Sequence, residues 1–392
     1  MSEFKLDFQD TATAFADKSD AELKEKSRIF RLLNSPFLNA IGTWSAKFAL
    51  SFGLPVEGLI KGTIFEQFCG GETIEECEPT INKLGAAGIG TILDYSIEGK
   101  STEGDFDRTK EEIIRTIKRA KDDPNIPFGV FKVTGIAPLG TLERLSGKKK
   151  LDAKSQMKCE HLNERVNEIC SYAYSIGQPV FIDAEETWIQ EAIDRLAVEM
   201  MEKYNLESPV IFTTLQMYRT DRLQYLKDAR RRAKNDGYIL AVKLVRGAYM
   251  EKERERAQEL GYPSPIHIDK KAADRDYDAA IDYCLDHLDD IAFVAGTHNE
   301  KSTRFLAKKM HELGIPHDHP RIFYSQLYGM SDNLSYVLGK NGYNVSKYVP
   351  YGPVKDTIPY LMRRAEENSS AAGQISRELD LITRELERRK LN

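Results

Sequence analysis

The chain contains 392 residues, of which 41% are hydrophobic and 30% charged, so it can bury a large core and is not a disordered tail. Asp and Glu total 61 against 56 for Lys and Arg, and the formal charge of -5 argues against nucleic acid as the main partner. The five cysteines are odd in number and lack CxxC spacing, which indicates reduced thiols and no zinc site or disulfide framework. Together these features favour a cytoplasmic protein.

The first 85 residues are predicted to form a helical arm. A helix is expected to open at Asp20, with Ser19 as its N-cap. Residues 1–23 lack the basic and apolar regions of a targeting peptide, so we expect them to stay on the mature protein. The apolar stretch Ser35–Ile60 predicts either a cap on the barrel or a membrane-docking patch. Its most apolar part, Phe48–Ile60, is interrupted by Gly53 and Pro55 and is too short to span a bilayer.

From residue 86 to 392, short apolar runs alternate with longer charged segments of helical periodicity. This alternation is typical of a parallel sheet covered by helices. The eight predicted strands are Thr91–Tyr95, Phe128–Val133, Pro179–Asp183, Pro209–Thr214, Leu240–Val245, Ile291–Ala295, Arg321–Ser325 and Val345–Val349. Eight strands favour an α/β fold of the (βα)8 TIM-barrel type over a doubly wound sheet.

Three further segments carry structural predictions. Gly85–Gly90 precedes a strand instead of following one, which favours a helix stop over a dinucleotide-binding loop. Leu139–Leu151 is turn-rich and predicts a mobile insertion after the second strand. Lys355–Arg389 predicts one or two helices with a basic end.

Polar side chains lie inside or just after several predicted strands. Lys132 lies in the second strand, Asp183 ends the third, and Lys243 lies in the fifth. Chemistry in such barrels sits at the carboxyl ends of the strands, and we therefore predict an ion pair between Lys132 and Asp183 there. An alternative is that Lys132 or Lys243 forms a Schiff base with a carbonyl substrate, as in an aldolase.

Two other features point to ligand binding. His298 has no HxH or HxxxH partner, which favours a hydrogen-bonding role over a metal site. The adjacent Arg363 and Arg364 could grip a carboxylate and reach a cofactor if their helix lies over the barrel. The alternative for this helix is an ordinary charged surface, with Arg363 and Glu367 as an i,i+4 pair.

Six segments resemble the proline dehydrogenase family in order and spacing. They are Phe181–Glu185, Lys243–Tyr249, Gly296–Asn299, Gln326–Met330, Lys347–Pro353 and the twin-arginine helix Tyr360–Asn368. The resemblance covers residues 90–375, and the tyrosine-rich eighth strand is most similar to the eukaryotic-type branch. It implies a distorted (βα)8 barrel with a C-terminal helix covering the substrate and with non-covalent FAD at the carboxyl ends of the strands.

The implied reaction is oxidation of L-proline to Δ1-pyrroline-5-carboxylate, with electrons passing to a membrane quinone. The implied location is cytoplasmic, with peripheral contact at the inner face of the cytoplasmic membrane. No metal and no nucleic acid are expected, and no oligomeric state is predicted. Hydroxyproline dehydrogenase is the neighbouring activity on this scaffold, and Tyr348, which would crowd a 4-hydroxyl group, favours proline.

The resemblance also implies site residues. Catalytic roles fall to Lys132, Asp183, Tyr348, Arg363 and Arg364, with Asp183 positioning Lys132. Substrate contacts are expected from Lys132, Leu244, Ala248, Tyr249, Tyr348, Arg363, Arg364 and Glu98. Cofactor contacts are expected from Asp183, Ala184, Gln216, Lys243, Val245, Arg246, Gly247, Ala248, Thr297, His298, Asn299, Gln326, Arg364 and Glu367. Position 243 is Lys where many bacterial members carry Arg beside the flavin N5.

Overall fold

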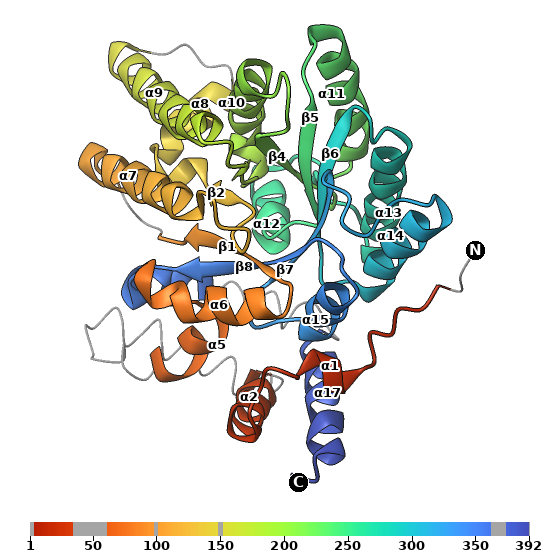
Figure 1. The fold of residues 1–392 in the computed structure, drawn as a ribbon. Coiled ribbons are helices and arrows are strands. Elements are labelled where there is room, and N and C mark those ends of the chain that lie inside the picture. Colours follow the sequence, from red (N-terminus) through yellow and green to blue (C-terminus); the bar gives the residue numbers. More distant parts are fainter. Residues whose placement is uncertain (1–3, 34–60, 98–100, 148–151, 362–373, 392) are drawn as a thin grey trace.

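Eight parallel strands form a ring at the centre of the described residues in a computed structural model (Figure 1). The described residues are 4–33, 61–97, 101–147, 152–361 and 374–391. The strands are β1 (Gly90–Tyr95), β2 (Gly129–Phe131), β3 (Val180–Ile182), β4 (Ile211–Gln216), β5 (Leu240–Val245), β6 (Ile291–Gly296), β7 (Ile322–Leu327) and β8 (Val345–Tyr351). All eight predicted strands are confirmed.

The ring follows the order β1-β8-β7-β6-β5-β4-β3-β2. Its two end strands approach where the Thr91 N–H donates to the Asn125 carbonyl just before β2, at 2.7 Å. Parallel strands joined by helical crossovers close in this way into a (βα)8 barrel, so the predicted fold class is confirmed. We call the end of the barrel at the carboxyl ends of the strands the barrel mouth.

Helices surround the ring in Figure 1. They are α1 (Thr11–Ala14), α2 (Asp20–Leu33), α5 (Glu66–Phe68), α6 (Glu78–Ala86), α7 (Glu103–Ala120), α8 (Leu139–Ser146), α9 (Ala153–Ser175), α10 (Thr187–Tyr204), α11 (Arg222–Asp236), α12 (Met250–Leu260), α13 (Lys270–Asp286), α14 (Glu300–Glu312), α15 (Asp332–Lys340) and α17 (Gln374–Arg388). Short π and 3-10 turns lie at Lys61–Phe65, Glu75–Cys77 and Val133–Gly135.

The strands alternate between two apolar layers, as the period of two along a strand requires. In β3, Phe181 belongs to the cluster inside the barrel, whereas Val180 and Ile182 belong to the larger layer between strands and helices. Inside the barrel, the Phe128 ring stacks on the Phe181 ring at 4.4 Å between centroids and meets the Phe212 ring edge-on at 5.4 Å. Aromatic side chains therefore fill the interior below the barrel mouth.

The helix signals of the sequence are confirmed at two places. Ser19 caps α2 through a reciprocal pair of bonds, in which the Glu22 N–H donates to Ser19 Oγ at 3.3 Å and the Ser19 N–H to Glu22 Oε2 at 2.7 Å. Helix α6 ends at Ala86, and Gly88 takes the positive φ of 70° that a helix stop often needs.

The prediction of a mobile insertion at Leu139–Leu151 is wrong for most of its length, because residues 139–146 form helix α8. Thr141 and Leu142 are buried on its inner face, and an amphipathic pattern over two turns outweighs Gly140 within the helix and Gly147 at its end. Residues 148–151 lie outside the described residues, as does the whole of Ser35–Ile60. The predicted C-terminal helices are present at residues 354–361 and in α17.

The two ends of the described chain pack together beside the barrel. In Figure 1, α2 and α17 lie side by side below the ring of strands. Phe15, Leu23 and Phe30 share one buried cluster with Leu381 and Ile382. No described helix has both the length and the apolar character that a membrane crossing requires.

Candidate active site

A buried carboxylate, ammonium and phenol meet at the barrel mouth. Asp183 follows β3 directly, and its two carboxylate oxygens accept hydrogen bonds from Lys243 of β5 and from the Tyr348 hydroxyl of β8. Thr214 of β4 adds a third donor at 3.4 Å. Burial, and then the Asp183 charge, raise the pKa of the Tyr348 phenol well above its ordinary value, so it stays a hydrogen-bond donor.

The Lys243 ammonium lies between two aromatic faces. Its Nζ is 4.7 Å from the centre of the Phe181 ring and 4.8 Å from that of Tyr348. Both distances suit a cation–π contact, which adds to the ion pair with Asp183. This group, Asp183, Lys243 and Tyr348, is therefore held rigidly by three different strands.

The predicted ion pair between Lys132 and Asp183 is wrong. Lys132 Nζ lies 3.2 Å from Oδ2 of Asp94, a β1 residue that is 2% exposed, and the Ser96 hydroxyl donates to the same oxygen. Lys132 follows β2, which lies between β1 and β3 in the barrel, and both oxygens of Asp183 are already engaged by Lys243 and Tyr348. Asp94 is a site residue that the sequence reasoning missed, although a lone carboxylate inside an apolar strand was the signal.

Several predicted cofactor contacts do face the mouth. Gln216 lies in β4, and its amide nitrogen donates to the Glu185 carbonyl at 2.7 Å. Gly247 has a φ of 133°, and a Cβ there would lie 2.5 Å from the Tyr218 ring, so the turn after β5 requires glycine. Ala184 and Ala248 are half-buried in the loops after β3 and β5, and Val245 is the half-buried last residue of β5. Tyr249, a predicted substrate contact, is half-buried in the loop after β5.

Other predicted contacts lie on the helix side of the strands. Leu244 is fully buried in the layer between strands and helices, on the face of β5 opposite Lys243. Contrary to the prediction of a substrate contact, its side chain does not reach the mouth. Gln326 likewise faces α15, where it accepts from the Ser335 hydroxyl at 2.8 Å and donates to the Thr297 carbonyl at 3.2 Å. Neither placement suits a direct ligand contact.

Arg246, Thr297 and Asn299 form a polar junction between β5, β6 and their helices. Arg246 binds Asp274 of α13 at 2.7 Å, Thr297 Oγ1 at 2.7 Å and Ser302 of α14 at 2.9 Å. Asn299 caps α14 by accepting the N–H groups of residues 301 and 302. These residues hold the loop after β6 and the first turn of α14, where the positive end of the helix dipole lies.

Glu185 is a second residue that the site predictions left out. Its carboxylate accepts the N–H of Thr134 at 3.0 Å and the Thr134 hydroxyl, in the turn that follows Lys132. Burial raises the pKa of Glu185 to about 7, although the two bonds from Thr134 lower it. Glu185 therefore ties the loop after β3 to the loop that carries Lys132.

The donor set at the mouth fits FAD, the cofactor that the family resemblance implies. An isoalloxazine ring and a pyrophosphate need hydrogen-bond donors and cations beside a close backbone approach. The mouth offers the Lys243 cation, the Gln216 amide and the glycine turn at 247. Among the described residues, no group of three His, Cys, Asp or Glu side chains is arranged to hold a metal ion.

Four predicted site residues, Glu98, Arg363, Arg364 and Glu367, lie outside the described residues. Just before the twin arginines, Tyr360 is buried, and its ring centre lies 5.9 Å from Lys132 Nζ. The helical segment 354–361 thus runs over the side of the mouth that holds Lys132 and Asp94.

Comparisons with known proteins agree with this geometry. A family model described as proline dehydrogenase matches residues 77–377. The carbapenem antibiotics biosynthesis protein CarD of Pectobacterium carotovorum is 37% identical over 333 residues, which are 85% of this chain and 86% of that protein. Proline dehydrogenase 1 of Dictyostelium discoideum is 32% identical over 435 residues, covering 98% of this chain and 75% of that protein.

A solved structure supports the fold. Proline utilization A from Bdellovibrio bacteriovorus, inactivated by N-propargylglycine, aligns with a TM-score of 0.73 and 20% identity over 95% of this chain. This chain spans 40% of the length of that protein. The family match over most of the sequence, on a barrel whose mouth gathers the residues described above, shows that the chain belongs to the proline dehydrogenase family.

Proposed function

We propose that this chain oxidises L-proline to Δ1-pyrroline-5-carboxylate with bound FAD and passes the electrons to a membrane quinone. The observation that carries the proposal is a pair of lysine–carboxylate contacts at one barrel mouth, Lys132–Asp94 and Lys243–Asp183. The buried Tyr348 of β8 donates to Asp183 at the same mouth. The first suits the substrate carboxylate and the second suits the flavin side.

In this proposal, Lys132 binds the carboxylate of proline. Its side chain is 19% exposed, so a substrate can reach the ammonium, while Asp94 is buried behind it and holds it in place. Arg363 and Arg364 complete the carboxylate site, and Glu98 closes over it; these three assignments rest on the family resemblance. Tyr348, Tyr249 and Ala248 provide the wall for the pyrrolidine ring.

The reaction removes two hydrogens from proline. The chemistry that FAD supplies is acceptance of a hydride from the ring carbon next to nitrogen. The protein must orient that carbon, exclude water and bind the amine in its unprotonated form, so that loss of the N–H proton leaves the neutral imine. The rigid Asp183–Lys243–Tyr348 group suits the orienting role because three strands fix it.

The Schiff-base alternative is weaker in this geometry. A lysine that attacks a carbonyl must be a neutral amine, and desolvation or a nearby cation is the usual way to favour that form. Lys132 and Lys243 instead each contact a buried carboxylate, which favours the ammonium. We also propose that residues 1–85 are an arm of the 86–392 barrel, because α2 packs against the C-terminal helix α17.

The test is L-proline-dependent reduction of a soluble quinone by the purified chain after reconstitution with FAD. The proposal predicts quinone reduction and a product with two hydrogens less than proline, identified by mass. Reduction that proceeds faster with 4-hydroxyproline would instead identify the neighbouring activity. Absence of FAD binding, or borohydride trapping of a carbonyl substrate on either lysine, would contradict the proposal.

A further inference from the structure

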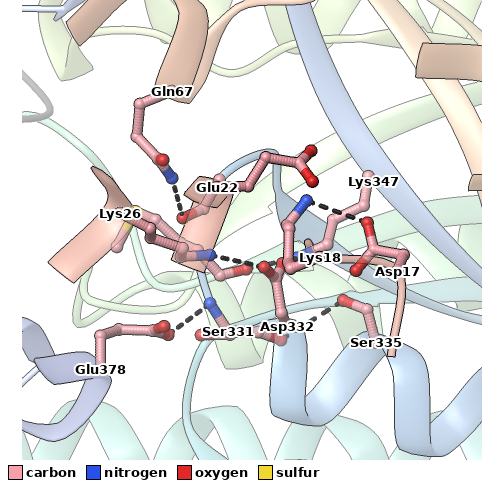
Figure 2. A network of polar contacts seen from close by, with 12 residues as sticks. Asp17, Lys18, Glu22, Lys26, Gln67, Ser331, Asp332, Ser335, Lys347 and Glu378 are labelled. Atoms are coloured by element: carbon pink, nitrogen blue, oxygen red, sulfur yellow. Dashed lines mark hydrogen bonds and ion pairs between the residues drawn. The ribbon is translucent and has the colours of Figure 1, made fainter. Parts of the chain in front are cut away.

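Four charged side chains are buried together where the N-terminal and C-terminal helices meet the barrel. We call Lys26, Asp332, Lys347 and Glu378 the buried charge cluster (Figure 2). Asp332 accepts from Lys26 at 2.5 Å and pairs with Lys347 at 2.9 Å, and the three side chains are 6%, 3% and 1% exposed in that order. The cluster joins α2, the start of α15, β8 and α17.

A buried ionic group of this kind is poor evidence for stability, because apolar side chains of similar volume often serve as well. Burial opposes ionisation of Asp332, yet Lys26 and Lys347 hold its pKa well below the ordinary value, so Asp332 stays ionised. Burial lowers the pKa of Lys347 and raises that of Glu378. The charged groups instead fix the geometry of the loop between β7 and α15. Lys347 and Glu378 contact particular backbone atoms of this loop, and Lys26 contacts Asp332 at its end.

That loop, residues 327–332, is fixed from three sides. Lys347 donates to the carbonyl of Met330 and, at 3.4 Å, to that of Leu327. Gln67 of α5 donates to the Gly329 carbonyl at 2.8 Å. Glu378 of α17 accepts the Ser331 N–H. Figure 2 shows Gln67 of α5, Glu378 of α17 and Lys347 of β8 around this loop.

Ser331 has a backbone conformation that needs such support. Its φ and ψ are 51° and 43°, the left-handed region that L-residues other than glycine and asparagine seldom adopt. Strained residues of this kind persist only where the surroundings fix them, and they gather at functional sites. The bond to Glu378 is the contact that holds the Ser331 amide in this orientation.

The strained residue points its side chain at His298. Ser331 Oγ lies 2.8 Å from His298 Nδ1, and the Leu327 N–H donates to His298 Nε2 at 3.4 Å. Because Nε2 accepts, the hydrogen of the neutral imidazole lies on Nδ1 and is donated to Ser331. Each ring nitrogen thus has a hydrogen-bond partner in the loop that the buried charge cluster contacts.

We propose that Glu378 is a positioning residue for the active site: through Ser331 it fixes the orientation and the Nδ1–H tautomer of His298 beside the cofactor. This inference rests on the proposed function in one respect, the placement of His298 at the flavin. It gives the C-terminal helix α17 a part in the site although that helix lies outside the barrel. From the N-terminal side, Lys26 of α2 contacts Asp332 at the end of the same loop.

The experiment is nitrogen-15 NMR of the histidine rings in the full chain, with the His298 signals assigned from a His298→Gln variant. Glu378→Ala should abolish the single Nδ1–H tautomer and give a mixture of both tautomers. Glu378→Gln should restore it, because an amide oxygen can also accept the Ser331 N–H. Glu385→Ala is the matched control, since Glu385 is a fully buried carboxylate on the same helix that binds Arg388 and Arg389.

Wild-type His298 signals in Glu378→Ala, or the same change in Glu385→Ala, would overturn the proposal. If Glu378→Ala does not fold, Ser331→Gly decides: it removes the hydroxyl and relieves the backbone strain, and it should give the same mixture of tautomers. A wild-type tautomer in Ser331→Gly would also overturn the proposal. Failure of the wild-type chain to bind FAD would refute the proposed function instead, because the tautomer is read without reference to the flavin.

Discussion

Replacing Asp183 with alanine removes the acceptor at the centre of the barrel mouth. Lys243, 5% exposed, would keep its charge without a carboxylate, and the Tyr348 hydroxyl would lose its acceptor. Removing one partner of a buried ion pair costs about 3–5 kcal/mol of folding free energy. We expect Asp183→Ala to fall in this range, which is large against the roughly 5–15 kcal/mol that stabilises an ordinary domain.

A double-mutant cycle with Lys243→Met isolates the interaction. In the double variant no unpaired charge remains in the mouth, so its loss of unfolding free energy should be smaller than the sum of the two single losses by about 2 kcal/mol. The assay is urea unfolding of the four proteins. Arg222→Met serves as the control partner, because Arg222 forms a buried pair with Asp194 between α10 and α11 and should combine additively with Asp183→Ala. A coupling energy near zero between positions 183 and 243 would refute the reasoning.

Three further predictions concern the mouth. Lys132→Met should raise KM for proline about tenfold or more, the value of a charge-assisted hydrogen bond, with little change in FAD affinity. Steady-state kinetics measure this change, and the control Lys110→Met, which removes a partly buried lysine paired with Glu168, should leave KM at the wild-type value. Tyr348→Ser should raise relative activity on 4-hydroxyproline because the phenol is removed, and an unchanged ratio of kcat/KM values for the two substrates would argue against that steric role. Burial raises the pKa of Glu185 to about 7 from an ordinary 4.5, so the folded protein binds this proton more tightly than the unfolded chain does. The contribution of Glu185 to the free energy of unfolding should therefore fall by up to about 3 kcal/mol as the pH rises from 4.5 to 7. Glu185→Gln should flatten the dependence of urea unfolding on pH in that window.

The barrel itself was predictable because its strands are short apolar, β-branched runs between charged segments. Such a run can be recognised as a strand from its own residues, without knowing which strands lie beside it. Strands β1 and β8 match their predicted ranges to within two residues. Helix α8 was missed because its flanking glycine and lysines are also typical of turns, and only the buried inner face distinguishes the two.

The pairing of charges was the part that sequence reasoning could not reach. Lys132 has carboxylates on both neighbouring strands, and which one it contacts depends on how Lys243 and Tyr348 occupy Asp183. The same holds for Leu244, whose type suits a substrate wall but whose place in β5 turns it toward the helices. Which carboxylate Lys132 contacts and which way Leu244 points both depend on the register and tilt of the strands.

The buried charge cluster shows the same limit over longer distances. Lys26 and Glu378 lie more than 300 residues apart in the chain, and each reads as an ordinary charged residue of an amphipathic helix. Only their burial against Asp332 and Ser331 makes them candidates for a role in the active site.

The central claim is that L-proline is the electron donor and FAD the acceptor at this barrel mouth. The most direct measurement is the visible absorbance of the FAD-reconstituted protein during anaerobic titration with L-proline. The account predicts bleaching of the flavin band with formation of the imine in equal amount, and a much weaker response in Lys132→Met at the same proline concentrations. A protein that binds no FAD, or a flavin that L-proline leaves oxidised, would contradict it.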